Sequence, residues 1–342
     1  MIGDIAKEMN VSVATVSRVL NGHPDVASET RQRVLEHIQR RHYVSNRTTR
    51  VHESARTNLI GVMTPEVTGG YFSELVAGVI EALDERDVRP VIGATHGKAD
   101  REVEFLKRFS RGATDGAVLI LPIAAVRHLA PLHHQGYPCV VLDPAIPLDD
   151  DIPVVTSSNV TGARQATEYL IGLGHRRIGV ITGHRDDEAG LEGVASRERL
   201  DGYEYALRVA GIPYDKDLIR SGAFSFDGGY DAAKGLLGLP VPPTAIFAFN
   251  DAMAAGVIRA ASERKLTLPD QLSIVGFDDA ETARYATPLL TSVHQPLQAM
   301  GRAAVRMLYD FLDRYAPDAP RVELSTRLVV RASTRQAPSI GP

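Results

Sequence analysis

Residues 2–22 read IGDIAKEMNVSVATVSRVLNG, and this stretch decides the fold of the N-terminal part of the chain. Four apolar residues recur at helical spacing in its first half, namely Ile2, Ile5, Ala6 and Met9. They predict a first helix that ends at Asn10, and Ser12 can cap a second helix. The inward face of that second helix would consist of Val16, Val19 and Leu20. The stretch therefore predicts two short helices separated by a tight turn.

The outward face of the second helix is small and polar, and it carries one arginine. Its members are Ser12, Val13, Ala14, Ser17 and Arg18. Such a face fits between the walls of a DNA major groove, where an arginine can read base edges. An ordinary helical hairpin with a small exposed face would show the same residues, so the helix pair alone leaves DNA binding open.

Length and composition indicate a globular protein with a large core. The chain has 342 residues, of which 44% are hydrophobic and 23% charged, so two or three domains are expected. No apolar run reaches the roughly 20 residues of a bilayer-spanning helix, and the N-terminus lacks the pattern of an export signal. The single cysteine, Cys139, is expected to be a buried small hydrophobe. We therefore expect a cytoplasmic protein without a membrane partner.

The charge is unevenly distributed along the chain. Residues 1–57 hold nine Lys and Arg against six Asp and Glu, a net charge of +3, so the total of −4 leaves −7 for residues 58–342. A basic head that contacts phosphates, joined to an acidic body, would show this asymmetry. Val34, Leu35 and Ile38 give a third helix its apolar stripe, so we predict a three-helix domain over residues 1–45. Residues 46–57 are polar and basic and are expected to form a linker.

From residue 58 onward, short runs rich in Val and Ile alternate with amphipathic helical patterns. The runs are NLIGVM, RPVIGAT, DGAVLIL, YPCVVLD, RIGVITG, TAIFAF and LSIVGF. This alternation is typical of a parallel sheet with helices on both faces, and seven strands are many for one sheet. We therefore predict two α/β lobes within residues 58–342. The break between them is expected near residues 145–158, with a return toward the first lobe near residues 291–320. Two closing strands are expected at about residues 321–324 and 327–331.

Several motifs, in their order and spacing, resemble the LacI/GalR (lactose-repressor) family of bacterial transcription regulators over nearly the whole chain. They are VSVATVSRVLNG (11–22), TRxxV (30–34), YVSNR (43–47), NLIGV (58–62), LGHRRIGVITG (173–183), RLDGY (199–203), FNDAMAAG (249–256) and SIVGFDD (273–279). The resemblance implies an all-α helix-turn-helix headpiece and a two-lobed body like a periplasmic binding protein. It also implies a homodimer or tetramer that binds a pseudo-palindromic operator and a small-molecule effector, with no cofactor and no metal.

The resemblance makes residues 13–20 the recognition helix. Val13 and Ala14 would meet base edges, where they can contact a thymine methyl group, and Arg18 can bind a guanine in bidentate fashion. Contacts to phosphates, which position the protein without specifying sequence, are assigned to Ser12, Thr15, Ser17 and Asn21.

The linker departs from the family pattern at the place where the family inserts an apolar side chain into the minor groove. His52 stands where leucine is usual, and Thr49 stands where alanine is usual. Either Val51 or His52 supplies the wedge, or the central kink in the DNA is weaker. Contacts to phosphates or to the minor groove are expected from Arg47 and Arg50.

The main effector contacts implied by the resemblance are Arg199, Asn250 and Asp278. Asp278 and Asn250 each follow an apolar strand, and Arg199 is expected to begin a helix after a long polar loop. Ligands of open α/β sheets bind at the carboxyl ends of the strands, where these residues would lie. A carboxylate and a guanidinium together suit the hydroxyl groups of a sugar.

Aromatic residues are the candidate walls of the same site. Tyr71 and Phe72, in the expected loop TGGYF, and Phe224, in GAFSFDGG, could cover the C–H faces of a sugar, although Phe72 could instead belong to the core. Asp143 ends a strand and is a further candidate acceptor. Asp251 is expected to cap the helix that it begins rather than to touch the effector.

These observations predict a ligand-responsive DNA-binding regulator, most simply a repressor that a sugar releases from its operator. Some relatives are instead helped onto DNA by a purine, so the direction of the ligand's effect stays open. An enzyme is disfavoured, because GxSxG, HExxH, a phosphate loop and clustered metal ligands are all lacking, although Asp143 and Asp278 could pair as acid and base. A transport receptor would need an export signal.

Overall fold

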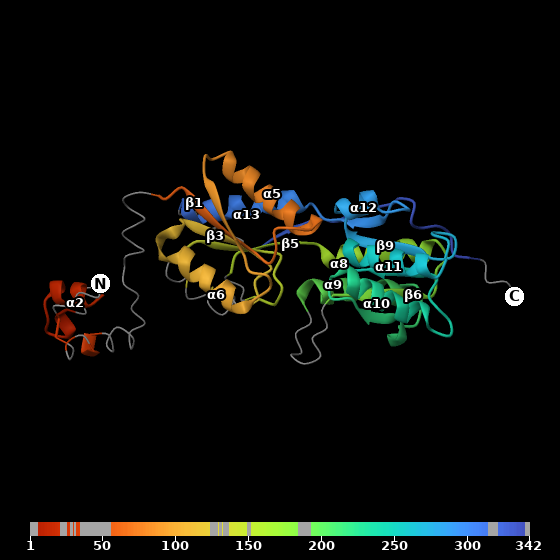
Figure 1. The fold of residues 1–342 in the computed structure, drawn as a ribbon, viewed down its shortest axis with the longest axis horizontal. Coiled ribbons are helices and arrows are strands. Elements are labelled where there is room, and N and C mark those ends of the chain that lie inside the picture. Colours follow the sequence, from red (N-terminus) through yellow and green to blue (C-terminus); the bar gives the residue numbers. More distant parts are fainter. Residues whose placement is uncertain are drawn as a thin grey trace.

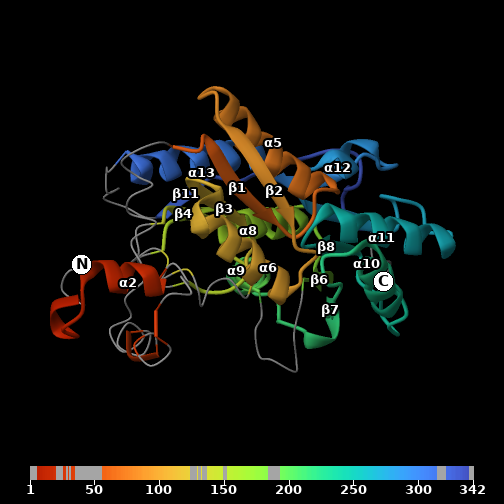
Figure 2. The same ribbon diagram turned by 60° about the vertical axis from the view of Figure 1, so that its left-hand side comes forward.

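Two α/β lobes dominate the structure, a computed structural model (Figures 1 and 2). Each lobe is built on one six-stranded sheet, and the helical N-terminal segment precedes them. The predicted fold class, a helical headpiece followed by a two-lobed body with parallel sheets, is confirmed. The residues that the structure describes are 6–20, 26–27, 30, 32–34, 56–123, 129, 132, 137–148, 152–183, 193–313 and 321–338.

The headpiece is organised around helix α2 (Val13–Leu20). The Ser12 hydroxyl accepts the backbone N–H of Thr15 at 3.0 Å, which confirms Ser12 as the cap of this helix. Asn10 adopts a left-handed φ of 54° in the turn before it. The small core beneath α2 includes the buried side chains of Ala6, Val16, Val19 and Val34.

The first lobe contains a wholly parallel sheet with strand order β11-β5-β4-β3-β1-β2. Its strands are β1 (Leu59–Thr64), β2 (Arg89–Ala94), β3 (Gly116–Ile120), β4 (Cys139–Leu142), β5 (Val154–Ser157) and β11 (Arg321–Leu324). Helices α5 (Gly70–Asp84) and α13 (Leu297–Leu312) pack together on one face, and α6 (Ala99–Arg108), followed by the π-helical turn η1 (Phe109–Ala113), covers the other. β3 and β4 are buried throughout, which explains their unbroken apolar runs.

The second lobe has strand order β12-β10-β9-β8-β6-β7, and only β12 runs antiparallel to its neighbour. Its strands are β6 (Ile178–Thr182), β7 (Ile219–Ser221), β8 (Ala245–Ala248), β9 (Ser273–Asp278), β10 (Thr291–His294) and β12 (Arg327–Val329). Its helices are α8 (Asn159–Gly172), α9 (Val194–Val209), the 3₁₀ turn η2 (Lys216–Leu218), α10 (Phe226–Leu237), α11 (Asp251–Glu263) and α12 (Glu281–Tyr285). The α8–α9 and α10–α11 pairs flank the sheet.

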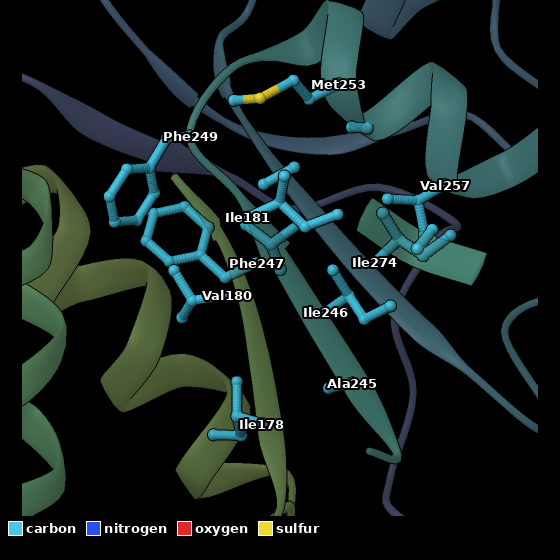
Figure 3. Packing of buried hydrophobic residues seen from close by; sticks show 14 of the residues in the cluster. Ile178, Val180, Ile181, Ala245, Ile246, Phe247, Phe249, Met253, Val257 and Ile274 are labelled. Carbon is cyan, nitrogen blue, oxygen red and sulfur yellow. The ribbon is translucent and has the colours of Figure 1, made fainter. Parts of the chain in front are cut away.

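Buried apolar side chains from β6, β8, β9 and α11 form the core of the second lobe. Figure 3 shows Val180, Phe247 and Ile274 among the residues of this cluster. Phe247 and Phe249 pack edge to face, with ring centroids 5.2 Å apart. This packing fixes the carboxyl ends of β6, β8 and β9, which face the first lobe.

The chain passes between the lobes three times. The crossings lie between β5 and α8, between β10 and α13, and between β11 and β12. The C-terminal α13 and β11 therefore return to the first lobe, whereas β12 belongs to the second. The two lobes are therefore joined by three chain segments.

The structure adds three strands that the apolar pattern does not indicate, namely β5, β7 and β10. β7 has the sequence IRS, of which only Ile219 is buried, and β10 has the sequence TSVH. Polar residues at strand ends interrupt the apolar signal in both segments, so neither segment is predicted as a strand in isolation.

Candidate functional site

The outward face of α2 is presented as the sequence predicts. Val13 is 55% exposed, and Ala14 and Arg18 are also exposed. Ser12 and Thr15 lie at the start of the helix, where their hydroxyl groups hydrogen-bond to each other at 2.8 Å. Several residues expected at the DNA lie outside the described residues: the side chain of Ser17, and Asn21, Arg47, Arg50, Val51 and His52.

Arg199 lies in the interior of α9 rather than at its start, which corrects the expected helix boundary. The helix begins at Val194, one turn earlier, so the side chain of Arg199 projects from a rigid segment. Its Nε donates to Oδ1 of Asn159 at 2.9 Å, and its Nη1 donates to the backbone carbonyl of Phe249. The guanidinium also stacks 3.7 Å from the ring centre of Phe277. These contacts hold a 2%-exposed cation in one place.

Asp278 is the last residue of β9 and lies beside Arg199. Its Oδ1 accepts the side-chain N–H of Gln295 at 2.7 Å and lies 4.0 Å from Nη1 of Arg199. Burial raises the pKa of Asp278 to about 7, although Arg199 and Gln295 both lower it. Ionising the buried Asp278 carboxyl group therefore costs free energy when no ligand is bound. A ligand that donates hydrogen bonds to the carboxylate would reduce this cost.

The first lobe contributes Tyr71 and Asp143 to the same region. The hydroxyl of Tyr71 donates to Oδ2 of Asp143, and Thr156 donates to Oδ1 at 3.4 Å. Burial raises the pKa of Asp143, while Tyr71 and then Arg199 lower it. Arg199 belongs to the second lobe, so its charge acts on Asp143 across the junction between the lobes.

Tyr71 and Phe72 are helical, which corrects the expected loop. Both lie in the first turn of α5, which begins at Gly70, and their rings pack edge to face with centroids 5.2 Å apart. Both also pack, half-buried, against the first-lobe core. The glycines of TGGY favour a loop, but a turn at Gly69 with φ of 80° allows the helix to begin at once.

Asn250, rather than Asp251, caps α11, so the expected role of Asp251 is wrong. Oδ1 of Asn250 accepts the backbone N–H of Met253 at 2.8 Å, and its Nδ2 donates to the carbonyl of Phe224 at 3.0 Å. Both Ala223 and Phe224 have left-handed φ values, 51° and 54°. The amide of Asn250 therefore stabilises the turn that carries the Phe224 ring.

Asp251 lies instead in a buried network behind Asp278. It accepts the Ser292 hydroxyl at 2.6 Å and the backbone N–H of Ala280 at 2.8 Å. Burial, and then the nearby Asp278, raise its pKa well above the usual value. Its hydrogen bonds fix the backbone immediately after Asp278. The motif FND contains both Asn250 and Asp251, but its sequence does not indicate which of the two side chains points into the interior.

The residues around Arg199 and Asp278 form one cluster of mixed charge. Asp143 and Asp278 provide two buried carboxyl groups, and Arg199 provides the guanidinium that interacts with both. Sequence reasoning missed Asn159 and Gln295, which orient Arg199 and Asp278. Their signal is weak, since each is a single polar residue beside a strand end. Among the described residues, no group of His, Cys, Asp and Glu is arranged to hold a metal ion.

A surface depression and the lengths of the helices bear on which partners the chain can have. A shallow depression of about 340 Å³ lies between α11 and α12, lined by Ala255, Ile258, Thr282, Tyr285 and Ala286. Within the described part of the chain, no helix is long and apolar enough to cross a membrane.

Comparison with known proteins identifies both parts of the chain. Residues 1–46 match the family described as bacterial regulatory proteins, lacI family, and residues 167–334 match the periplasmic binding protein-like domain. The chain is 33% identical to catabolite control protein A of Priestia megaterium over 334 residues, covering 98% of this chain and 99% of that protein. It is 32% identical to the ribose operon repressor of Escherichia coli K12, covering 96% and 98%.

A solved structure of similar sequence shows the same architecture. The transcriptional regulator CelR, in complex with cellobiose, superimposes with a TM-score of 0.75 at 31% identity. The match covers 97% of this chain and 99% of that chain.

Proposed function

Because the chain belongs to the lacI family of bacterial regulatory proteins, we propose that it is a repressor that a sugar releases from a pseudo-palindromic operator. The observation that supports this proposal most is the cluster of Arg199, Asp278 and Asp143 at the junction of the lobes. A ligand held there would contact both lobes, and closing or opening them would change the spacing of two headpieces. The protein would act on DNA inside a bacterial cell and would catalyse no reaction.

The chemistry of the cluster favours a neutral polyol. Two carboxyl groups accompany one guanidinium, so the cluster offers no surplus of positive charge to bind an anionic ligand such as a sugar phosphate. Hydroxyl groups, by contrast, can donate to Asp278 and Asp143 and accept from Arg199. Phe224, whose ring lies 6.0 Å from the Arg199 guanidinium, would form an apolar wall for the ligand.

We propose a homodimer as the active form, since a pseudo-palindrome presents two equal half-sites. The depression between α11 and α12 is lined by Tyr285, which is 77% exposed, and Leu289, a few residues further along the chain, is 48% exposed. On the first lobe, the edge strand β2 exposes Val91 and Ile92. A second copy of the chain could cover both apolar surfaces. Sedimentation velocity at micromolar protein should therefore show a dimer, and a monomer would contradict this part of the proposal.

Two measurements test the proposal together. The first is a thermal-shift panel of monosaccharides, disaccharides and nucleobases, in which a ligand at about 100 times its dissociation constant should stabilise by about 2.7 kcal/mol. The second is operator binding, with a duplex selected from a random library, measured with and without each stabilising ligand. Release from DNA by a sugar is the expected result. Tighter operator binding in the presence of a nucleobase would show corepression instead. If the protein bound no selected duplex at low salt, the proposal would be wrong.

Gly183 provides a test of the proposed aromatic wall. A Cβ atom at this position would overlap the Phe224 ring, so Gly183→Ala must displace the ring. The sugar that releases the wild type should bind the variant about fivefold more weakly in calorimetry, since an aromatic contact contributes on the order of 1 kcal/mol. Gly172→Ala is the matched control, because its Cβ would have no other atom within 4 Å. Equal affinities for the two variants would remove Phe224 from the site.

A further inference from the structure

A chain of buried side-chain hydrogen bonds crosses the junction between the lobes and ends on Asp278. Ser157, the last residue of β5 in the first lobe, donates its hydroxyl to Oε1 of Gln295. The Nε2 of Gln295 donates in turn to Oδ1 of Asp278 in the second lobe, at 2.7 Å. Both Ser157 and Gln295 are 1% exposed. The carboxylate proposed to hold the effector is therefore linked to the opposite lobe through a single amide.

Hydrogen bonds also join the two other segments that cross between the lobes. Ser158 lies between β5 and α8, and Thr326 lies between β11 and β12. The Thr326 backbone N–H donates to Oγ of Ser158 at 2.9 Å, and its hydroxyl donates to the Ser158 carbonyl at 3.1 Å. Asn159, the next residue, accepts from Arg199. Arg199 and Asp278 are thus both anchored at residues that lie at a crossing or next to one.

We propose that Gln295 is a positioning residue that couples occupancy of Asp278 to the relative orientation of the lobes. A glutamine amide can donate to Asp278 and accept from Ser157 at the same time only while the two strand ends keep their separation. A rotation of the lobes would break one of these bonds and leave a buried polar group unsatisfied, which is costly. A ligand hydroxyl that moves Asp278 would therefore change which lobe orientation is stable.

This inference rests on the proposed effector site, but it can be tested without an effector. Ser157→Ala removes the first-lobe end of the chain and leaves the bond between Gln295 and Asp278 in place. Thr167→Val is the matched control, since it removes a buried hydroxyl that donates to the Ala163 carbonyl within the second lobe. Each change is made in a protein that carries spin labels on cysteines introduced at the exposed positions Lys107 and Lys234, one on each lobe.

The first readout is the distribution of distances between the two labels, measured by pulsed electron resonance without ligand. Ser157→Ala should broaden or shift the distribution, and Thr167→Val should match the wild type. The second readout is the factor by which the releasing sugar weakens operator binding, which Ser157→Ala should reduce about threefold to tenfold. The affinity of the sugar for the DNA-free protein should change less than threefold.

Identical distance distributions for Ser157→Ala and Thr167→Val would overturn the inference, whatever the ligand results. If the wild type binds no operator or sugar, the proposed function fails, while the distance comparison still decides the role of the Ser157–Gln295–Asp278 chain. A loss of sugar affinity equal to the loss of coupling would also overturn it, because that result would place Ser157 in the binding site itself.

Discussion

Asp278→Asn is expected to abolish the response to the effector and at the same time to stabilise the ligand-free protein at pH 8. Asparagine keeps the size of the side chain and an acceptor for Gln295 but removes the charge. A hydrogen bond to a charged group contributes about 1.5–3 kcal/mol, so effector affinity should fall by roughly one to two orders of magnitude. Calorimetry with the releasing sugar measures this loss.

The stability gain follows from the direction of the pKa shift. The pKa of Asp278 is raised from 3.8 to about 7 in the folded protein, mainly by burial. Between these values the unfolded chain is ionised and the folded chain is not, so stability is lost progressively as pH rises toward 7. The asparagine amide of the variant never ionises, and the variant should therefore gain more at pH 8 than at pH 5. We expect the additional rise in Tm to be on the order of 5 °C.

The neighbouring carboxylate gives a control of opposite sign. Burial raises the pKa of Asp279, but hydrogen bonds from His294 and Arg331 outweigh burial, and the pKa is lowered overall. Asp279→Asn should therefore lower the Tm at pH 8. A variant of Asp278 that loses stability at pH 8, or gains equally at pH 5, would refute the account of its burial.

Arg18→Ala is expected to remove sequence-specific DNA binding while sparing most of the non-specific binding. Arg18 lies exposed on α2, one turn beyond Val13 and Ala14, and is the one cation on the described face of that helix. A bidentate contact between arginine and guanine contributes about 1–3 kcal/mol of discrimination, or about 5- to 150-fold in affinity. Fluorescence anisotropy with the selected operator and with a scrambled duplex, at one stated salt concentration, measures the specific and the non-specific affinity.

Lys7→Ala is the matched control for this variant. Lys7 is exposed on the preceding helix, so its loss should weaken binding to both duplexes by a similar, small factor. If Arg18→Ala kept the wild-type ratio between operator and scrambled duplex, the assignment of base reading to this residue would be wrong.

The architecture was largely predictable from the sequence because its signals are local. Runs such as GAVLI in β3 are buried on both faces, and burial on both faces requires unbroken apolar sequence. The cap at Ser12 and the inward face of α2 likewise depend on residues within one or two turns. The strands β5, β7 and β10 were not predicted because they are short and partly polar. Their extended conformation depends on hydrogen bonds to neighbouring strands, which the local sequence does not show.

The site was less predictable because its geometry depends on contacts between distant segments. Asp278, Arg199 and Asp143 could be placed at the lobe junction from their motifs. The partners that orient them, Asn159 and Gln295, are far away in the sequence and have no motif of their own. The cap of α11 shows the same limit, since either Asn250 or Asp251 could have supplied it and only Asn250 does. Asp251 turns inward because Ser292 in β10 and the backbone of Ala280 after β9 donate hydrogen bonds to it.

We expect the lobe junction and the headpieces to be energetically linked. The most direct test measures operator affinity with and without saturating sugar, and sugar affinity with and without saturating operator, under one set of conditions. Energetic linkage predicts that the two ratios are equal, differ from one by about 5- to 150-fold, and approach one together in Asp278→Asn. A sugar that binds the lobes but leaves operator affinity unchanged would contradict it.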